Sequence, residues 1–455
     1  MYWANFLHIY QPPTQKQHWV EKITEESYRR IVRGLKENSH AKATVNINGI
    51  LCELLAKYNG QDVLDDLRLL IKRGQVELTG SAMYHPLLPT LPEDEIKRQI
   101  KLNTEASKKF FGQLYQPNGF FPPEMGFSKK VAEVAQAMGF RWVIADELSF
   151  GKDINQIDYS VIYEVAGLKN FYIFFRERKM SYKILSGQLG TGELLIDSLG
   201  DRLHKDEYLL TAMDGETFGH HRPGMEHLLF EIYKSKKLET VNVSELIGLF
   251  ADRKSVDPLP STWALMEKDL ENNAPFSRWN DPKNIIHKKQ WQLTNLAIKT
   301  THRLDKDDKS YAKVRPALDR AIHSDQFWWA SAKPWWSLEM IEAGAKELKD
   351  TILINSKATK KEKDQAISLY QDIIFTGFEW QRDGTVERLS KEEDEEVRQR
   401  TDQGMPKLPK SEIKKIILNI NKEMKAVADK QEFERAAQLR DRIKELESYA
   451  KEATE

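Results

Sequence analysis

One stretch of the chain ends an apolar, strand-like run in several groups that can exchange protons. In residues 207–224, EYLLTAMDGETFGHHRPG, the run stops at Asp214 and Glu216 and is followed by His220 and His221. Burying carboxylates and imidazoles costs free energy unless they are paired or used in chemistry. We therefore predict that this stretch carries part of a functional site.

A second acidic group, Glu124, lies in the segment FFPPEMG at 120–126. Its two prolines fix the backbone, and its aromatic residues give the carboxylate an apolar setting. Retaining cleavage of a glycosidic bond needs one carboxylate to attack the anomeric carbon and one carboxylic acid to protonate the leaving oxygen. Glu124 and Asp214 can supply this pair, and we expect them to lie about 5 to 5.5 Å apart.

Residues 1 to about 290 alternate between strand and helix patterns. Apolar runs typical of strands lie at 2–10, 43–47, 75–78, 141–145, 171–175 and 208–213. Amphipathic stretches with helical spacing lie at 25–37, 61–73, 93–111 and 129–138. This alternation predicts parallel strands in an α/β fold, and six or more such units predict a closed or nearly closed barrel.

Polar side chains gather at the ends of the predicted strands. They are His8, Gln11, Asn46, Asn48, Glu77, His85, Asp146, Glu147 and Asp214. Taken singly, each is explained equally well as a helix cap or a surface group. In parallel α/β barrels, however, the carboxyl ends of the strands form one face, where active sites are built. We therefore expect these residues to line one pocket.

Residues 291–390 have no strand pattern, so we expect a helical subdomain there. It contains the segment HSDQFWW at 323–329. Asp325 and Trp328 are three residues apart and would share one helical face, with Trp329 beside them. A carboxylate and an indole suit the hydroxyls and the apolar face of a sugar ring, and we predict that this segment completes the active site.

The C-terminal part of the chain changes composition again. Residues 391–410 contain a Gly-Met-Pro segment and are predicted to be a linker. Two amphipathic stretches in residues 411–455 predict an antiparallel helical hairpin with a small core of its own.

The composition excludes several classes of partner. Lys plus Arg and Asp plus Glu both number 69, so there is no net charge to favour nucleic acid or an anionic membrane. The single cysteine, Cys52, is expected to be a buried hydrophobe in a reducing compartment. The chain begins with a strand pattern, and no stretch approaches the ~20 apolar residues of a membrane span. We expect a cytoplasmic protein with no cofactor and no bound metal.

Five short motifs resemble, in order and spacing, the motif regions of glycoside hydrolase family 57. They are HIYQP (8–12), QVELTG (75–80), FPPE (121–124), DGETFG (214–219) and SDQFW (324–328). Members of this family are retaining enzymes that act mostly on α-glucans, including α-amylases and 4-α-glucanotransferases. The resemblance implies a distorted (β/α)7 pseudo-barrel at 1–290, followed by the helical subdomain.

The resemblance also assigns roles to individual residues. It makes Glu124 the nucleophile and Asp214 the acid/base, with His8, Glu77, Asp325 and Trp328 binding sugar. We expect the same role for their neighbours Tyr10, Gln11, Phe121, Glu216, His220, His221 and Trp329. Tyr10 and Phe121 stand where the family usually has histidine and tryptophan, which puts the identity of the sugar in doubt. The resemblance therefore leaves hydrolysis and transglycosylation of an α-glucan or oligosaccharide both open.

The C-terminal segment has its own resemblance. Residues 421–446 are similar to the UVR motif, a helical hairpin of the UvrB and UvrC repair proteins that mediates protein contacts. This implies a protein partner for residues 411–455. A hairpin that packs on its own barrel is the alternative. The segment has no basic stripe, so we do not expect it to bind nucleic acid.

Two other functions remain as alternatives. In a metal-dependent hydrolase or deacetylase, His8, Asp214, His220 and His221 would gather round an ion, although no metal-binding spacing is present. In a non-catalytic scaffold, the barrel would bind glucan and the C-terminal segment would recruit a protein.

Overall fold

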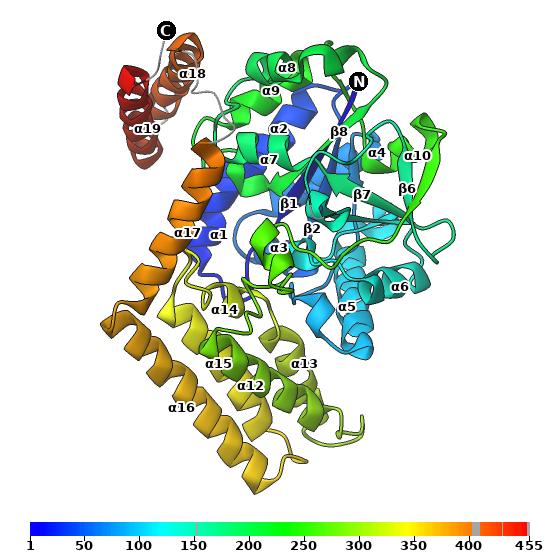
Figure 1. The fold of residues 1–455 in the computed structure, drawn as a ribbon, viewed down its shortest axis with the longest axis vertical. Coiled ribbons are helices and arrows are strands. Elements are labelled where there is room, and N and C mark those ends of the chain that lie inside the picture. The colour runs from blue at the N-terminus through cyan, green and yellow to red at the C-terminus, as the bar shows by residue number, and fades with distance from the viewer. Residues whose placement is uncertain (152, 403–409, 430, 453–455) are drawn as a thin grey trace.

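The computed structural model describes residues 1–151, 153–402, 410–429 and 431–452, with the backbone alone for 394–402, 449 and 452. Figure 1 shows a strand-and-helix body, a helical region beside it, and a separate helical pair near the C-terminus. The fold is α/β, as predicted.

The strands of the barrel belong to two sheets. They are β1 (Tyr2–Ile9), β2 (Ala43–Ile47), β3 (Val76–Leu78), β4 (Gly119–Phe120), β5 (Trp142–Asp146), β6 (Ile162–Val165), β7 (Tyr172–Arg176), β8 (Tyr208–Asp214), β9 (Glu239–Thr240) and β10 (Arg253–Val256). One sheet has the order β3-β2-β1-β8, with β9 also on β1, and the other has the order β10-β6-β7-β5-β4. All pairs are parallel except β6 with β7. The strands predicted from the apolar runs are confirmed.

Backbone hydrogen bonds join the two sheets at both ends. Gly80, after β3, donates to Gly119 O at 2.8 Å and accepts from Phe121 N at 2.9 Å. On the other side, Glu177 N, just after β7, donates to Leu210 O of β8 at 2.7 Å. Within the described residues, strands β1, β2, β3, β4, β5, β7 and β8 thus form a distorted ring.

Buried side chains fill the ring and its outer layer. Phe6, Trp142, Phe174 and Leu210 belong to the cluster inside the strands. Both faces of these strands are covered, which is why the sequence shows continuous apolar runs rather than alternation.

Helices surround the barrel (Figure 1). They are α1 (Gln17–Ile23), α2 (Arg29–Glu37), α3 (Gly49–Lys57), α4 (Gln61–Lys72), α5 (Glu93–Phe111), α6 (Lys129–Ala137), α7 (Arg178–Leu185), α8 (Gly192–Leu199), α9 (Glu226–Lys234) and α10 (Val243–Leu249). The helix predicted at 25–37 differs in one respect: its first turn is a π-helix, η1 (Thr24–Tyr28). A π-turn rotates the side chains that follow it, and such turns are frequent at functional sites.

The helical region follows the barrel. It consists of α11 (Glu267–Glu271), α12 (Ile285–Thr301), α13 (Tyr311–Ala321), α14 (Asp325–Trp328), α15 (Leu338–Leu353), α16 (Lys360–Arg382) and α17 (Thr385–Asp402). Its core is continuous with barrel residues, since Ile100 of α5 and Leu318 of α13 belong to one buried cluster.

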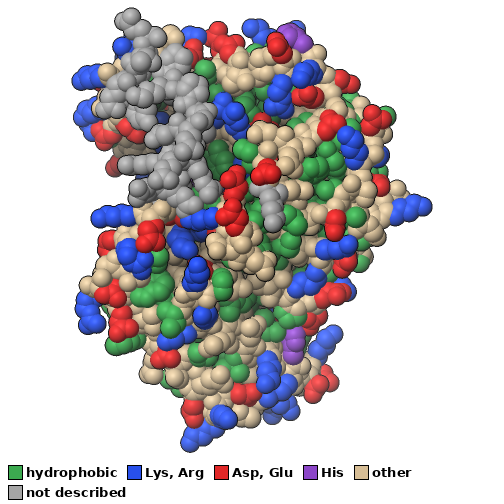
Figure 2. All heavy atoms as spheres, in the orientation of Figure 1, with side chains coloured by type: hydrophobic (Ala, Val, Ile, Leu, Met, Phe, Trp, Pro, Cys, Tyr) green, Lys and Arg blue, Asp and Glu red, His purple; other side chains and the backbone are tan. Residues whose placement is uncertain are grey.

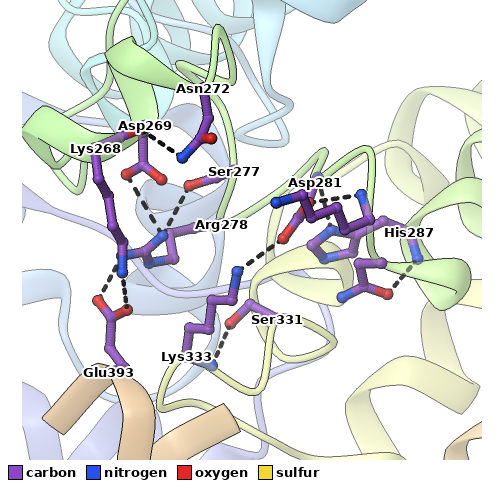
Figure 3. A network of polar contacts seen from close by, with 12 residues as sticks. Lys268, Asp269, Asn272, Ser277, Arg278, Asp281, His287, Ser331, Lys333 and Glu393 are labelled. Atoms are coloured by element: carbon purple, nitrogen blue, oxygen red, sulfur yellow. Dashed lines mark hydrogen bonds and ion pairs between the residues drawn. The ribbon is translucent and has the colours of Figure 1, made fainter. Parts of the chain in front are cut away.

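Helix α17 occupies part of the predicted linker. Residues 391–402 continue this helix, whereas 403–409 lie outside the described residues. Figure 3 shows how α17 is attached: Glu393 accepts from Arg278, which also lies 3.6 Å from Asp269. With Lys333 and Asp281, whose charged atoms are 2.8 Å apart, this network borders a cavity of about 370 Å³.

The C-terminal hairpin pairs α18 (Lys410–Asp429) with α19 (Phe433–Glu452). Its small core is formed by Ile413, Ile420, Val427, Leu439, Ile443 and Leu446. The hairpin predicted from the two apolar stripes is therefore present.

The surface in Figure 2 carries acidic and basic side chains interspersed, without a large field of one sign. In the described part of the chain, every helix is too short or too polar to cross a membrane.

Candidate active site

Glu124 lies in a tight turn after β4, within the 3-10 turn Pro123–Met125. Its φ of +61° is left-handed, a strained conformation for a residue other than glycine. Oε1 accepts from Ser324 Oγ at 2.9 Å, and Oε2 accepts from Trp263 Nε1 at 3.1 Å. The backbone N–H of Trp263 also donates to Glu124 O at 3.2 Å. Both carboxylate oxygens are therefore fixed by donors from distant parts of the chain.

The surroundings of Glu124 favour its neutral form. Burial raises the pKa of Glu124 to about 8, and the negative charge of Asp325 adds to the rise. The negative charge of Asp214 raises this pKa further. The hydrogen bonds from Ser324 and Trp263 act in the opposite direction and lower the pKa.

Asp214 ends β8 and stands opposite His8 in the parallel register with β1. Burial raises the pKa of Asp214 to about 7, while the nearby Arg176 lowers it. Arg176 ends β7 and donates from Nε to Asp146 Oδ2 at 2.8 Å. A carboxylic acid protonated near neutral pH suits proton donation to a leaving group.

Glu216 is held two residues further on. Its Oε1 accepts from the hydroxyl of Tyr28, from Gln11 Nε2 at 3.2 Å and from Tyr10 N at 3.4 Å. Burial, reinforced by the charge of Asp214, raises the pKa of Glu216 to about 8. These bonds tie the segment after β1 to the segment after β8.

Two histidines and two other rings form a stack beside Glu124. His8 Nε2 and His85 Nε2 are 3.1 Å apart, and His8 Nδ1 lies 2.8 Å from Asn46 Oδ1. The ring centroid of His8 is 4.8 Å from that of Phe121, and that of Tyr10 is 3.9 Å from His85. Burial lowers the pKa of His8 to about 4, so these imidazoles are neutral at pH 7.

Asp325 joins this group from helix α14. Its Oδ2 accepts from the Tyr10 hydroxyl at 2.7 Å and lies 3.0 Å from His323 Nδ1. Although burial opposes ionisation, the hydrogen bond from His323 keeps the pKa of Asp325 below its ordinary value, and the hydrogen bond from Tyr10 acts in the same direction. The site thus contains one carboxylate that is readily ionised beside three whose ionisation is suppressed.

Trp328 and Trp329 contribute to an aromatic cluster on the same helical region. The ring of Trp328 lies 5.0 Å from that of Trp279, and that of Trp329 lies 5.9 Å from Trp335. Both rings are partly exposed. Their sugar contacts remain a prediction.

Three expected site residues make contacts elsewhere. Glu77 accepts from Thr44 Oγ1 at 3.3 Å, near the amino end of β2, and from Ser244 N at 3.1 Å on α10. This carboxylate therefore points away from the carboxyl ends of the strands, and its contacts do not support a role in sugar binding. The register explains this placement, because Glu77 stands opposite Thr44, the second residue of β2, and so lies toward the amino end of that strand.

The side chains of His220 and His221 also form no hydrogen bond, ion pair or ring contact with the other predicted site residues that the structure describes. His220 Nδ1 lies 2.6 Å from Glu26 Oε2, and His221 is exposed. A shared metal site with His8 is not formed, since His8 bonds Asn46 and His85. Among the described residues, the group with metal-ligand spacing is instead Asp94, Glu95 and His302, on α5 and after α12.

Sequence reasoning missed several residues of the site. Trp263 follows β10 in a segment without a motif, and Ser324 lies in the fifth motif but was not predicted to contact Glu124. Arg176 directly follows the strand predicted at 171–175. A basic residue at the carboxyl end of a barrel strand was the signal that could have identified it. Trp263 carried no comparable signal.

The sequence matches two known families. The family model for Glycosyl hydrolase family 57 matches residues 2–257, and that for the UvrB/uvrC motif matches residues 414–449. The chain is 28% identical over 280 residues to an alpha-amylase of Pyrococcus horikoshii, covering 58% of this chain and 43% of the relative. It is 31% identical over 219 residues to a 4-alpha-glucanotransferase of Thermococcus kodakarensis, covering 47% and 32%. The chain spans less than half the length of these curated relatives.

Solved structures share the fold. A GH57 branching enzyme from Thermococcus kodakaraensis aligns with a TM-score of 0.64 at 14% identity, covering 83% of this chain and 96% of that one. A 4-alpha-glucanotransferase from Thermococcus litoralis aligns with a TM-score of 0.58 at 19% identity, covering 77% and 59%. Because the family match extends over more than half of its residues, the chain belongs to glycosyl hydrolase family 57.

Proposed function

We propose that the protein is a retaining glycosidase or transglycosylase acting on α-glucans. The observation that carries this proposal is Glu124, whose two carboxylate oxygens accept hydrogen bonds from Ser324 and Trp263. The charge of Asp214 raises the pKa of this carboxyl group. Fixed geometry and a matched pair of carboxyl groups are what double displacement at an anomeric carbon requires.

In the first step, an ionised oxygen of Glu124 attacks the anomeric carbon. The bond from that carbon to the glycosidic oxygen breaks, and the leaving oxygen takes the proton of Asp214. The product is a glycosyl ester of Glu124 with the carboxylate of Asp214.

In the second step, Asp214 takes a proton from water or from a sugar hydroxyl. The oxygen that loses this proton attacks the anomeric carbon, and the ester bond to Glu124 breaks. Water gives hydrolysis, and a sugar acceptor gives transfer with the same configuration.

An α-glucan is the proposed substrate because the curated relatives are named as an alpha-amylase and a 4-alpha-glucanotransferase. Tyr10, His8, Phe121 and Asp325 offer stacked rings and hydroxyl-binding groups beside Glu124. We place the reaction in the cytoplasm, consistent with a single buried thiol, Cys52.

The test is incubation with purified maltooligosaccharides and separation of the products by length. Shorter products alone indicate hydrolysis, and a ladder extending to longer chains indicates transfer. Glu124→Ala should lower kcat about 10⁴-fold or more, because the carboxylate that forms the ester is removed. Added azide should restore turnover of an activated glycoside and give a glycosyl azide of inverted configuration.

The matched control is Glu133→Ala, an exposed carboxylate on α6 nine residues further along the chain, which should retain full activity. Full activity in Glu124→Ala would refute the assignment. Binding of glucan by the wild-type protein without any product would favour the scaffold alternative.

A further inference from the structure

The C-terminal hairpin packs against the loop that joins β8 to α9. Ile420 of α18 approaches Gly224, where an added Cβ would lie 2.7 Å from Ile420 Cγ1. Likewise, an added Cβ at Gly190 would lie 2.6 Å from Ile416 Cδ1. The hairpin therefore packs closely on the barrel at two glycines, where a larger residue would clash with its isoleucines.

Charged groups are buried in the same interface. Glu226, at the start of α9, is fully buried and pairs with Arg30 at 2.9 Å and with Arg435 of α19 at 3.3 Å. Glu423 of α18 pairs with Arg30 and Arg435 and lies 2.9 Å from His227 Nε2. Buried ions are tolerated only in a well-defined arrangement of partners, so this network fixes the position of the hairpin.

Arg435 also holds the backbone of the fourth motif. Its Nη1 donates to Gly219 O at 2.6 Å, and the side chain is 5% exposed. Gly219 lies three residues after Glu216, whose carbonyl accepts from His220 N at 3.2 Å and His221 N at 2.8 Å. The hairpin is thereby hydrogen-bonded to the turn that follows Asp214.

A second path runs through helix α2. Arg30, bound to both hairpin and barrel carboxylates, follows the π-turn η1. In that turn, Ser27 Oγ donates to Gly215 O at 2.9 Å and Tyr28 donates to Glu216. The two acceptors lie one and two residues after Asp214.

We propose that the hairpin formed by α18 and α19 supports the active site, and that its Arg435 is a positioning residue for Asp214. This inference rests on the proposed role of Asp214 as acid/base. The guanidinium fixes the Gly219 carbonyl, and the fixed turn keeps the Asp214 carboxyl group in the geometry needed to reach the glycosidic oxygen.

Arg435→Gln tests this proposal, because glutamine retains part of the length and loses the charge. We expect kcat on a maltooligosaccharide to fall about 10-fold to 100-fold with KM nearly unchanged, since substrate contacts are intact and only alignment is lost. Arg435→Lys should recover part of this loss. Arg440→Gln, an exposed position on the same helix, should match the wild type.

Amide hydrogen exchange supplies a readout independent of activity. In Arg435→Gln, the peptide covering residues 217–226 should exchange faster, whereas strand β2 should exchange as in the wild type. Faster exchange throughout the barrel would show general unfolding and would overturn the positioning role.

The two hypotheses fail in different ways. If the wild type converts no glucan, the proposed function fails and the exchange of residues 217–226 alone decides whether Arg435 holds the loop. If the wild type is active and Arg435→Gln has unchanged kcat and unchanged exchange in 217–226, the positioning role is refuted.

Discussion

Glu124 is subject to opposing influences that the enzyme has to balance. Burial and the charges of Asp325 and Asp214 raise its pKa, and the hydrogen bonds from Ser324 and Trp263 lower it. A nucleophile must be ionised to attack, so the two donors keep a reactive fraction present in a site that otherwise favours the neutral acid.

Trp263→Phe should shift the pH dependence of kcat/KM. Phenylalanine keeps the ring and removes the Nε1–H bond to Glu124 Oε2, so the pKa of Glu124 rises further above its present value of about 8. The reactive form has Glu124 ionised and Asp214 protonated. The limb of the kcat/KM–pH profile that reports ionisation of Glu124 should therefore move to higher pH by roughly one unit. The other limb should stay in place.

Activity at pH 7 should fall about 10-fold in this variant, because less of the enzyme carries an ionised Glu124. Trp380→Phe is the matched control, since Trp380 stacks on Trp336 in the helical region. A pH profile that is unchanged, or that moves to lower pH, would contradict the role given to Trp263.

At the residue scale, the motifs led to Glu124 and Asp214, but motif residue Glu77 makes its contacts elsewhere, and Trp263, which lies in no motif, was missed. Tyr10 donates to Asp325 and stacks on His8, whereas the sugar contacts of these residues remain a prediction. Trp263 could not be predicted, because its approach to Glu124 depends on how the segment after β10 folds back over the strand ends.

The β8–α9 loop shows how an element depends on one backbone position. Gly219 has a φ of +112°, and an added Cβ would lie 1.9 Å from the carbonyl oxygen of Glu26. The loop can pass this close to η1 only where the residue has no side chain.

Gly219→Ala should therefore destabilise the protein strongly, by more than about 4 kcal/mol, because backbone on both sides must shift. Gly74→Ala is the matched control: its φ is +70°, but nothing lies within 4 Å of the added Cβ. That variant should lose only about 1 kcal/mol from the left-handed conformation. Urea unfolding of both variants gives the comparison, and equal losses would mean that contact with Glu26 is unimportant.

Long elements were predictable from periodicity, and short ones were not. Strands β1 and β8 are extended apolar runs, whereas β4 has two residues and takes its place in the ring through Gly80. Its pairing depends on a partner some forty residues away in the chain, which local pattern does not reveal.

The site depends on contact between the barrel and the helical region. Ser324 and Asp325 come from the helical region, and Ser324 N donates to His85 O of the barrel at 3.0 Å. The sequence predicted that both regions contribute to the site. It did not predict what joins them. The ion pairs between α5 and α13 are formed by charged residues that a helical pattern would place at the surface, and they lie more than two hundred residues apart in the chain.

Glu95 of α5 is the centre of that junction. It is 1% exposed and accepts two hydrogen bonds from Arg315 at 2.8 Å each, and it lies 2.7 Å from His302 Nε2. Arg315 also pairs with Asp319 at 2.9 Å. A doubly bonded pair this deeply buried leaves an uncompensated charge when one partner is removed.

Glu95→Ala should lower the free energy of unfolding by about 3 kcal/mol, since Arg315 keeps only Asp319 as a partner. Glu93→Ala, two residues earlier and exposed on α5, should leave the thermal midpoint unchanged. If docking of the helical region creates the site, activity in Glu95→Ala should disappear on heating together with the loss of structure seen by circular dichroism. Activity that persists after the helical region has separated would show that the barrel alone holds Glu124 in its reactive position.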